Sequence, residues 1–154
     1  MAMLLTHILQ PACIRVPLSS RDKSSAIIEL IETLDEVGQL KDKEAVKQVV
    51  FAREETRSTG IGSGIAIPHG KCNAVKELVM ALGIAHESID FDSVDGRPVR
   101  IIILVVSPQD QTGAHIQALA SISRLMLDEQ FREALVNSTT PDEAYRLLQD
   151  KEKE

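Results

Sequence analysis

The stretch TGIGSGIAIPHGK, residues 59–71, contains the residue of this chain with the clearest capacity for chemistry, His69. Near neutral pH a large share of histidine side chains is uncharged, and a neutral imidazole can act as a base or as a nucleophile. Glycine or alanine occupies the even positions of 60–66 and mostly isoleucine the odd ones, so an extended chain would bury one face and leave the other nearly bare. Pro68 would end such a strand, which predicts that His69 stands at its end with clearance from Gly70.

Two glycine-rich phosphate motifs do not fit this stretch. The phosphate loop has the pattern GxxxxGK followed by Ser or Thr. Here five residues separate Gly64 from Gly70, and Lys71 precedes Cys72. The dinucleotide-binding pattern GxGxxG also fails, because the glycines repeat as GxGxG and lead into a histidine rather than a helix. The histidine itself is therefore the feature to explain.

Three other roles for this region are weaker. His69, Cys72 and His115 would supply too few ligands for a metal site, and Ser63 lacks the GxSxG surroundings of a hydrolase nucleophile. A histidine that follows a proline can also be an ordinary loop residue. The sequence has no carboxylate cluster with the spacing of a divalent-ion site, so we expect neither a metal ion nor a dissociable cofactor.

The composition predicts a single α/β domain over residues 1–154, with its core in about 5–150 and a frayed tail at 151–154. Hydrophobic residues make up 44% and aromatic residues 3% of the chain, so the core must be mostly aliphatic, which disfavours an aromatic-rich sandwich. The formal net charge of −6 would repel a polyanion, so we expect no nucleic acid partner.

The sequence gives no indication of membrane insertion or export. No apolar stretch approaches the length of a membrane span, and MAMLLTHILQ lacks the charged start and long apolar core of a signal peptide. Cys13 and Cys72 are too few for a disulfide framework and are expected to be free thiols. These features predict a cytosolic protein without direct membrane insertion.

Hydrophobic periodicity predicts alternating helices and strands along the chain. Asp42 and Thr140 are suitable N-caps, Pro141 would occupy a first helical position, and Gly38 lies where a helix should end. Helices are predicted at 27–37, 45–52, 115–126, 131–136 and 141–148, and strands at 13–18, 60–67, 78–85 and 101–106. Short connections between them favour a central sheet with helices packed on its faces.

Two further residues complete a recognisable set: Arg53, sixteen residues before His69, and His115 in TGAHIQALASISRLM. With GIGSGIAIPHG, they make the sequence resemble the fructose/mannitol-type (type 2) enzyme IIA domains of the bacterial phosphoenolpyruvate-dependent sugar phosphotransferase system (PTS), over about residues 5–150. The resemblance is closest to the stand-alone nitrogen-regulatory branch. It implies an α/β sandwich of the phosphotransferase/anion transport protein type, a small mixed sheet flanked by helices. Ser63 stands where mannitol-type members have an acidic residue and nitrogen-regulatory ones an asparagine, which leaves the branch open.

The resemblance also implies roles and partners. His69 would carry the phosphoryl group, received from the phosphocarrier HPr or its nitrogen-system counterpart, with His115 as the second active-site histidine and Arg53 as the active-site arginine. The group would pass to a IIB component of a sugar permease, or its presence would be a signal to a regulated partner. No IIB or membrane segment is part of this sequence, which favours the regulatory branch, although separate IIA chains also serve transport. The alternative is a non-catalytic binding module that has the same fold and uses His69 little.

Phosphoryl transfer chemistry agrees with these roles. It requires an in-line nucleophile and positive or hydrogen-bonding groups around the phosphoryl oxygens. If a backbone carbonyl holds one nitrogen of His69, the other is fixed as the attacking atom, and we expect this to be Nε2. The planar guanidinium of Arg53 can grip two oxygens. His115 is expected near the first turn of a helix, where free amides and the dipole favour an anion.

Overall fold

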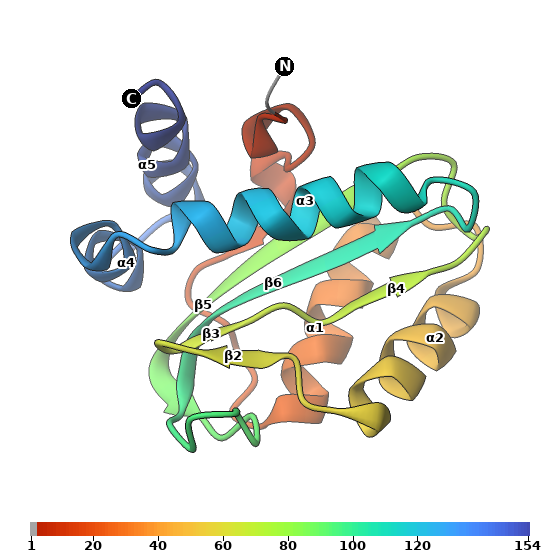
Figure 1. Ribbon diagram of the computed structural model, residues 1–154, viewed down its shortest axis with the longest axis horizontal. Coiled ribbons are helices and arrows are strands. Elements are labelled where there is room, and N and C mark those ends of the chain that lie inside the picture. The colour runs from red at the N-terminus through yellow and green to blue at the C-terminus, as the bar shows by residue number, and fades with distance from the viewer. Residues whose placement is uncertain (1–2) are drawn as a thin grey trace.

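A six-stranded mixed sheet forms the centre of the computed structural model, which describes residues 3–154 (Figure 1). Its strands are β1 (Ile14–Arg15), β2 (Gly60–Gly62), β3 (Ile65–Ala66), β4 (His69–Lys71), β5 (Val79–Ile89) and β6 (Val99–Ser107). The order across the sheet is β1-β5-β6-β3-β2, and β4 also pairs with β6. Strands β5 and β6 are antiparallel, whereas β1 runs parallel to β5, and β3 and β4 run parallel to β6.

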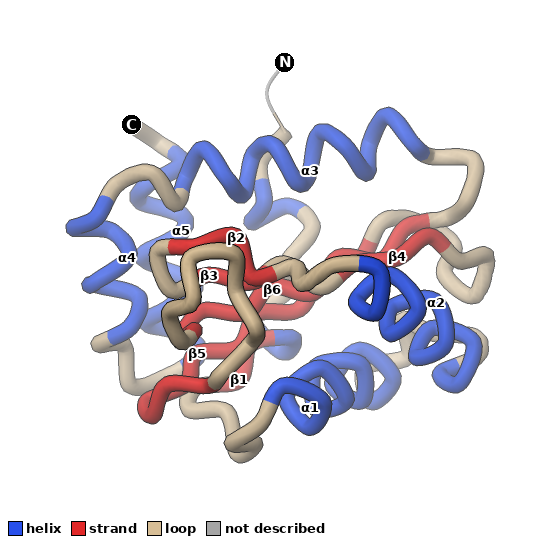
Figure 2. Tube along the Cα trace, turned by 60° about the horizontal axis from the view of Figure 1, so that its bottom comes forward, coloured by secondary structure: helices blue, strands red, loops and turns tan. Residues whose placement is uncertain are grey.

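Helices cover both faces of this sheet, as the sequence predicted. They are α1 (Lys23–Glu36), α2 (Lys43–Thr56), α3 (Thr112–Leu125), α4 (Glu129–Val136) and α5 (Pro141–Glu152), preceded by the short 3-10 turns η1 (Leu5–His7) and η2 (Pro11–Cys13). Figure 2 shows α1 and α2 on one side of the sheet and α3 on the other. Within residues 3–154, no helix combines the length and the apolarity that a membrane span needs.

Strands β5 and β6 form the middle of the hydrophobic core. Their pairing begins with Val79 opposite Val106 and continues to Ile84 opposite Ile101, and the side chains along this stretch are buried. Strands that are covered on both faces are apolar throughout rather than alternating. The two buried strands predicted from the sequence are therefore confirmed.

Several helix ends are set by the residues that the sequence predicted. Asp42 accepts a hydrogen bond from the amide of Ala45 at 3.1 Å at the start of α2. Thr140 accepts one from the amide of Glu143 at 3.1 Å at the start of α5. Gly38 follows the end of α1 with a φ of 79°, a left-handed conformation that glycine adopts without strain. An N-cap of this kind typically stabilises a helix by about 1 kcal/mol.

The prediction of one strand over residues 60–67 is wrong, because this segment folds back on itself. β2 and β3 pair antiparallel through a turn at Ser63 and Gly64, whose φ angles are 58° and 79°. Two-residue hairpin turns require a positive φ at one or both central residues, and glycine supplies it readily. The alternation of glycine and isoleucine thus reflects a turn rather than one bare strand face, and Ile61 is 48% exposed.

The frayed tail predicted at 151–154 is wrong for its first half, because α5 continues to Glu152. Lys151 Nζ lies 2.7 Å from a carboxylate oxygen of Asp128, the N-cap of α4. Glu152 accepts a hydrogen bond from the hydroxyl of Thr6 at 2.7 Å. These contacts tie the last turn of α5 to the start of α4 and to η1.

Gly60 lies where an added methyl group would meet Ser93. A Cβ atom on Gly60 would lie 2.9 Å from Cβ and 3.0 Å from Cα of Ser93, inside the distance at which carbon atoms repel. We expect Gly60→Ala to lower the free energy of unfolding by about 1–3 kcal/mol, as overpacking typically does. Urea denaturation measures this difference. In the control Gly113→Ala the added methyl meets nothing within 4 Å, so stability should hold or rise; two variants of equal stability would contradict the packing.

Candidate functional site

His69 is the first residue of β4, a strand held by the middle of the sheet. It lies opposite Val105 of β6, and the preceding Pro68 accepts the amide of Val105 at 3.0 Å. The next residue, Gly70, packs against α2, since a Cβ atom there would lie 2.9 Å from Cγ2 of Val49. Gly70 therefore lets α2 approach β4 closely. His69 begins this strand, whereas the sequence analysis placed it at the end of the preceding one.

The ring of His69 is oriented by its own backbone. Nδ1 lies 2.7 Å from the carbonyl oxygen of Ile67. A carbonyl oxygen can only accept a hydrogen bond, so Nδ1 carries the proton and Nε2 keeps its lone pair. This is the arrangement expected from the sequence, with one nitrogen fixed and the other available as a nucleophile.

The surroundings of His69 favour its uncharged form. Its burial lowers the pKa of His69 below the ordinary 6.5, and the nearby guanidinium of Arg53 lowers it further. The hydrogen bond to Ile67 and the carboxylate of Glu54 act in the opposite direction without reversing the shift. Near neutral pH the imidazole is therefore mostly neutral, as a nucleophile must be.

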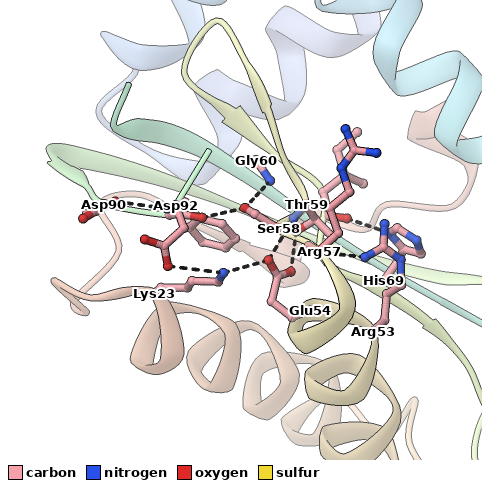
Figure 3. Close-up of polar contacts among 12 residues, drawn as sticks. Lys23, Arg53, Glu54, Arg57, Ser58, Thr59, Gly60, His69, Asp90 and Asp92 are labelled. Carbon is pink, nitrogen blue, oxygen red and sulfur yellow. Dashed lines mark hydrogen bonds and ion pairs between the residues drawn. The ribbon is translucent and has the colours of Figure 1, made fainter. Parts of the chain in front are cut away.

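Arg53 lies near the end of α2, beside the histidine. Its Nη1 donates a hydrogen bond to the carbonyl oxygen of Arg57 at 2.8 Å, and Figure 3 shows its side chain rising from the helix toward His69. Both arginines and His69 line a cleft of about 240 Å³. Neither guanidinium is within ion-pair distance of a carboxylate in the part of the chain that the structure describes. The cleft therefore has positive charge that an anion could neutralise.

A buried carboxylate holds the loop that forms one wall of this cleft. Glu54 is 7% exposed, and its Oε2 accepts the amide of Thr59 at 2.8 Å and lies 2.9 Å from Nζ of Lys23 (Figure 3). The hydroxyl of Thr59 donates to the other carboxylate oxygen. Glu54 was not predicted as a site residue, because the polar run REETR is typical of a solvent-exposed segment. Only the packing of α1 against α2 shows that it is enclosed.

His115, from α3, lies next to His69. It is in the first turn of α3, only 5% exposed, and its ring centroid lies 5.4 Å from that of His69 in an edge-to-face arrangement. Burial lowers the pKa of His115 from 6.5 to about 4, with smaller contributions from the charges of His69 and Lys71. His115 is therefore uncharged at neutral pH.

The structure brings the three predicted site residues, Arg53, His69 and His115, to one place from α2, β4 and α3. As predicted, His115 lies in the first turn of α3, and its own amide donates to the carbonyl oxygen of Gln111 at 3.0 Å. Ser107, whose hydroxyl lies 2.7 Å from Nδ1 of His115, was not predicted from the sequence. No sequence signal singled it out, because a serine at the end of an apolar strand is unremarkable.

A larger cleft, of about 700 Å³, lies between the β2–β3 turn and α4. Its walls include Ser63, Arg97 and Arg132 but neither histidine of the site. The smaller cleft is the better candidate, since it combines a largely uncharged imidazole with positive charge that is not paired with a carboxylate. Within residues 3–154, no group of three or more His, Cys, Asp or Glu side chains is placed to hold a metal ion.

Residues 7–151 match the family of the phosphoenolpyruvate-dependent sugar phosphotransferase system, EIIA 2. The chain belongs to this family. It is an enzyme IIA domain, and the family to which it belongs has a phosphotransferase role. This agrees with the resemblance seen in the sequence.

Relatives of this enzyme IIA domain come from both branches. The fructose-specific EIIABC component of Bacillus subtilis is 31% identical over 98% of the chain, which spans only 24% of that longer protein. The nitrogen regulatory protein of Bradyrhizobium diazoefficiens is 33% identical, over 94% of both chains. Nitrogen regulatory protein IIA-Ntr of Neisseria meningitidis has the same fold, with a TM-score of 0.86 and 30% identity over 95% of this chain and 99% of that one. The predicted α/β fold is thereby confirmed.

The low pKa of His115 predicts a loss of stability in acid. As the pH falls below 6.5 the unfolded chain binds a proton at this residue, whereas the folded chain does so only near pH 4. Between about pH 7 and about pH 4.5 the free energy of unfolding should therefore fall by about 2 kcal/mol more in the wild type than in His115→Gln, whose side chain does not titrate. Urea denaturation at both pH values measures the difference. Equal losses in the two proteins would contradict the low pKa.

Proposed function

We propose that this enzyme IIA domain is a phosphocarrier that accepts a phosphoryl group on Nε2 of His69 and passes it on. One observation carries the proposal: Nδ1 of His69 is hydrogen-bonded to the carbonyl oxygen of Ile67 at 2.7 Å, which leaves the lone pair on Nε2 free. The ring borders a cleft that two arginines also line. The donor would be a phosphohistidine of HPr or of its nitrogen-system counterpart. The active unit would be the single domain, residues 1–154, in the cytosol.

The transfer step follows from the protonation state of the ring. The lone pair on Nε2 of His69 attacks the phosphorus, and the bond from phosphorus to the donor's imidazole breaks with its electron pair staying on the donor. Nδ1 keeps its proton and its hydrogen bond to Ile67, which stabilises the positive charge that develops on the ring. No proton has to move within the domain during the step.

The groups around His69 would stabilise the phosphoryl oxygens. Arg53 offers a planar guanidinium that is already held by the carbonyl of Arg57, so little side-chain freedom is lost on binding. His115 adds a neutral ring close to His69. Stabilisation would come mainly from charge and from pre-organised donors rather than from covalent chemistry.

A carrier protein would dock on the apolar rim of the cleft. Ile61 and Val94 line the cleft and are 48% and 65% exposed. Exposed apolar side chains grouped beside a reactive residue are typical of a protein-binding surface. The acceptor would be a IIB component, consistent with the fructose-specific relative, or the phosphorylated state would be a signal, consistent with the nitrogen regulatory relatives.

Intact mass spectrometry tests the phosphocarrier proposal. After incubation with phosphoenolpyruvate, enzyme I and HPr, the wild type should gain the mass of one phosphoryl group, and acid should remove it because a phosphorus–nitrogen bond is acid-labile. His69→Ala and His69→Gln should gain none, whereas His86→Ala, which changes a histidine on β5, should behave as the wild type. A wild type that gains nothing with the HPr of either system would refute the proposal and favour the binding-module alternative.

The role of Arg53 is tested by lysine substitutions at the two arginines of the cleft. Arg53→Lys keeps the charge but loses the two-pronged grip, so the rate of phosphoryl acceptance should fall by about 10-fold to 100-fold. Arg57→Lys keeps the backbone carbonyl that anchors Arg53, so its rate should change by about twofold or less. Quench-flow kinetics with phosphorylated HPr measure both rates. If both variants instead kept rates within about twofold of the wild type, positive charge alone, and not the two-pronged grip of Arg53, would account for the role.

A further inference from the structure

Ser107 connects the central strand of the sheet to the second histidine of the site. It is the last residue of β6, and its side chain has no exposed surface. Its Oγ lies 2.7 Å from Nδ1 of His115, and within residues 3–154 no other atom is placed to hydrogen-bond this hydroxyl. The two side chains therefore depend on each other for their polar contacts.

This contact determines which nitrogen of His115 carries the proton. If Nδ1 carried it and donated to Ser107, the serine hydrogen would have no acceptor in a site without solvent, which typically costs about 1–3 kcal/mol. If Ser107 donates to Nδ1 instead, both groups are satisfied. A neutral imidazole has one proton, which then lies on Nε2.

We infer that Ser107 is a positioning residue, which donates its hydroxyl hydrogen to Nδ1 of His115 and so holds that ring as the tautomer whose Nε2–H can donate to a phosphoryl group on His69. The inference deepens the proposed function, on which its kinetic part rests. Its structural part, the tautomer of His115, does not depend on any phosphorylation.

The two histidines then have opposite protonation patterns that suit opposite tasks. His69 has Nδ1–H bonded to a carbonyl and a free lone pair on Nε2, as a nucleophile needs. His115 has its lone pair occupied at Nδ1 and an N–H at Nε2, as a donor to an anion needs. A lone pair at Nε2 of His115 would instead repel the phosphoryl oxygens.

The same strand fixes both rings. Within the β4–β6 ladder, His69 lies opposite Val105 and Lys71 opposite Ser107, and the carbonyl oxygen of Ser107 accepts the amide of Cys72 at 2.8 Å. Ser107 thus cannot shift relative to β4 without breaking this ladder. The hydroxyl that orients His115 and the backbone that positions His69 belong to one rigid unit.

Nitrogen NMR of the uniformly 15N-labelled protein tests the tautomer at neutral pH, where one-bond and two-bond couplings distinguish a protonated ring nitrogen from a bare one. We expect His115 to be protonated at Nε2 alone in the wild type. In Ser107→Ala the proton should be shared between the two ring nitrogens, and in Ser107→Thr, which restores a hydroxyl, it should return to Nε2. Ser121→Ala is the matched control, because Ser121 is also a buried serine and lies on the same helix as His115. A proton on Nδ1 of His115 in the wild type would overturn the inference.

A second experiment compares the rates at which the same variants accept a phosphoryl group. Ser107→Ala should accept the group from phosphorylated HPr about tenfold more slowly, with Ser107→Thr close to the wild type and Ser121→Ala unchanged. A Ser107→Ala rate equal to that of Ser121→Ala would overturn the positioning role. If the wild type accepts no phosphoryl group at all, the proposed function fails, and the tautomer measurement still decides the assignment at His115. Urea denaturation of Ser107→Ala checks that a slower rate does not come from unfolding.

Discussion

The hydrogen-bond ladder of β6 is the constraint on which the site depends. This strand pairs with β5, β3 and β4, so its position relative to the core is fixed from both sides. Its pairing with β4 positions His69, and the hydroxyl of its last residue, Ser107, hydrogen-bonds His115 on α3. Because the strand is buried along most of its length, a change in its register would break hydrogen bonds to its neighbours and leave backbone groups unpaired away from water, which is strongly opposed. Rigidity at the site is therefore a consequence of core packing.

A second buried contact keeps the carboxylate of Glu54 away from the guanidinium of Arg53. Glu54 is adjacent in sequence to Arg53, and an ion pair between them would neutralise the guanidinium that faces the cleft. The carboxylate is instead engaged by Lys23 and Thr59 inside the protein. Burying an ion pair costs desolvation energy that only good geometry and further hydrogen bonds offset, so this pair is weak evidence of stability. Its clearer effect is that Arg53 stays available while the loop after α2 is held in place.

Much of this fold could be predicted from local sequence, because its signals are local. The caps at Asp42 and Thr140 act within one helical turn, and the apolar runs of β5 and β6 report burial on both faces. The β2–β3 hairpin was missed because glycine and isoleucine alternate in the same way in a strand as in a tight turn flanked by short strands. Ser107 and Glu54 could not be predicted, since their importance depends on partners brought near by tertiary packing. The prediction of Arg53 and His115 came from the family resemblance, and the structure adds the contacts that position them.

A phosphocarrier has to bind the phosphoryl group tightly enough to receive it and loosely enough to release it. If His69 carries the phosphoryl group as proposed, neutral rings at His69 and His115 would serve this balance, since a protonated histidine would add charge that stabilises the bound group without favouring its transfer. A protonated His69 could not attack at all, because its lone pair would be occupied. Burial lowers the pKa of both rings, so in the proposed mechanism Arg53 would supply the positive charge and the two histidines a lone pair and an N–H group. The aliphatic core that encloses the histidines is in this sense part of the chemistry of the site.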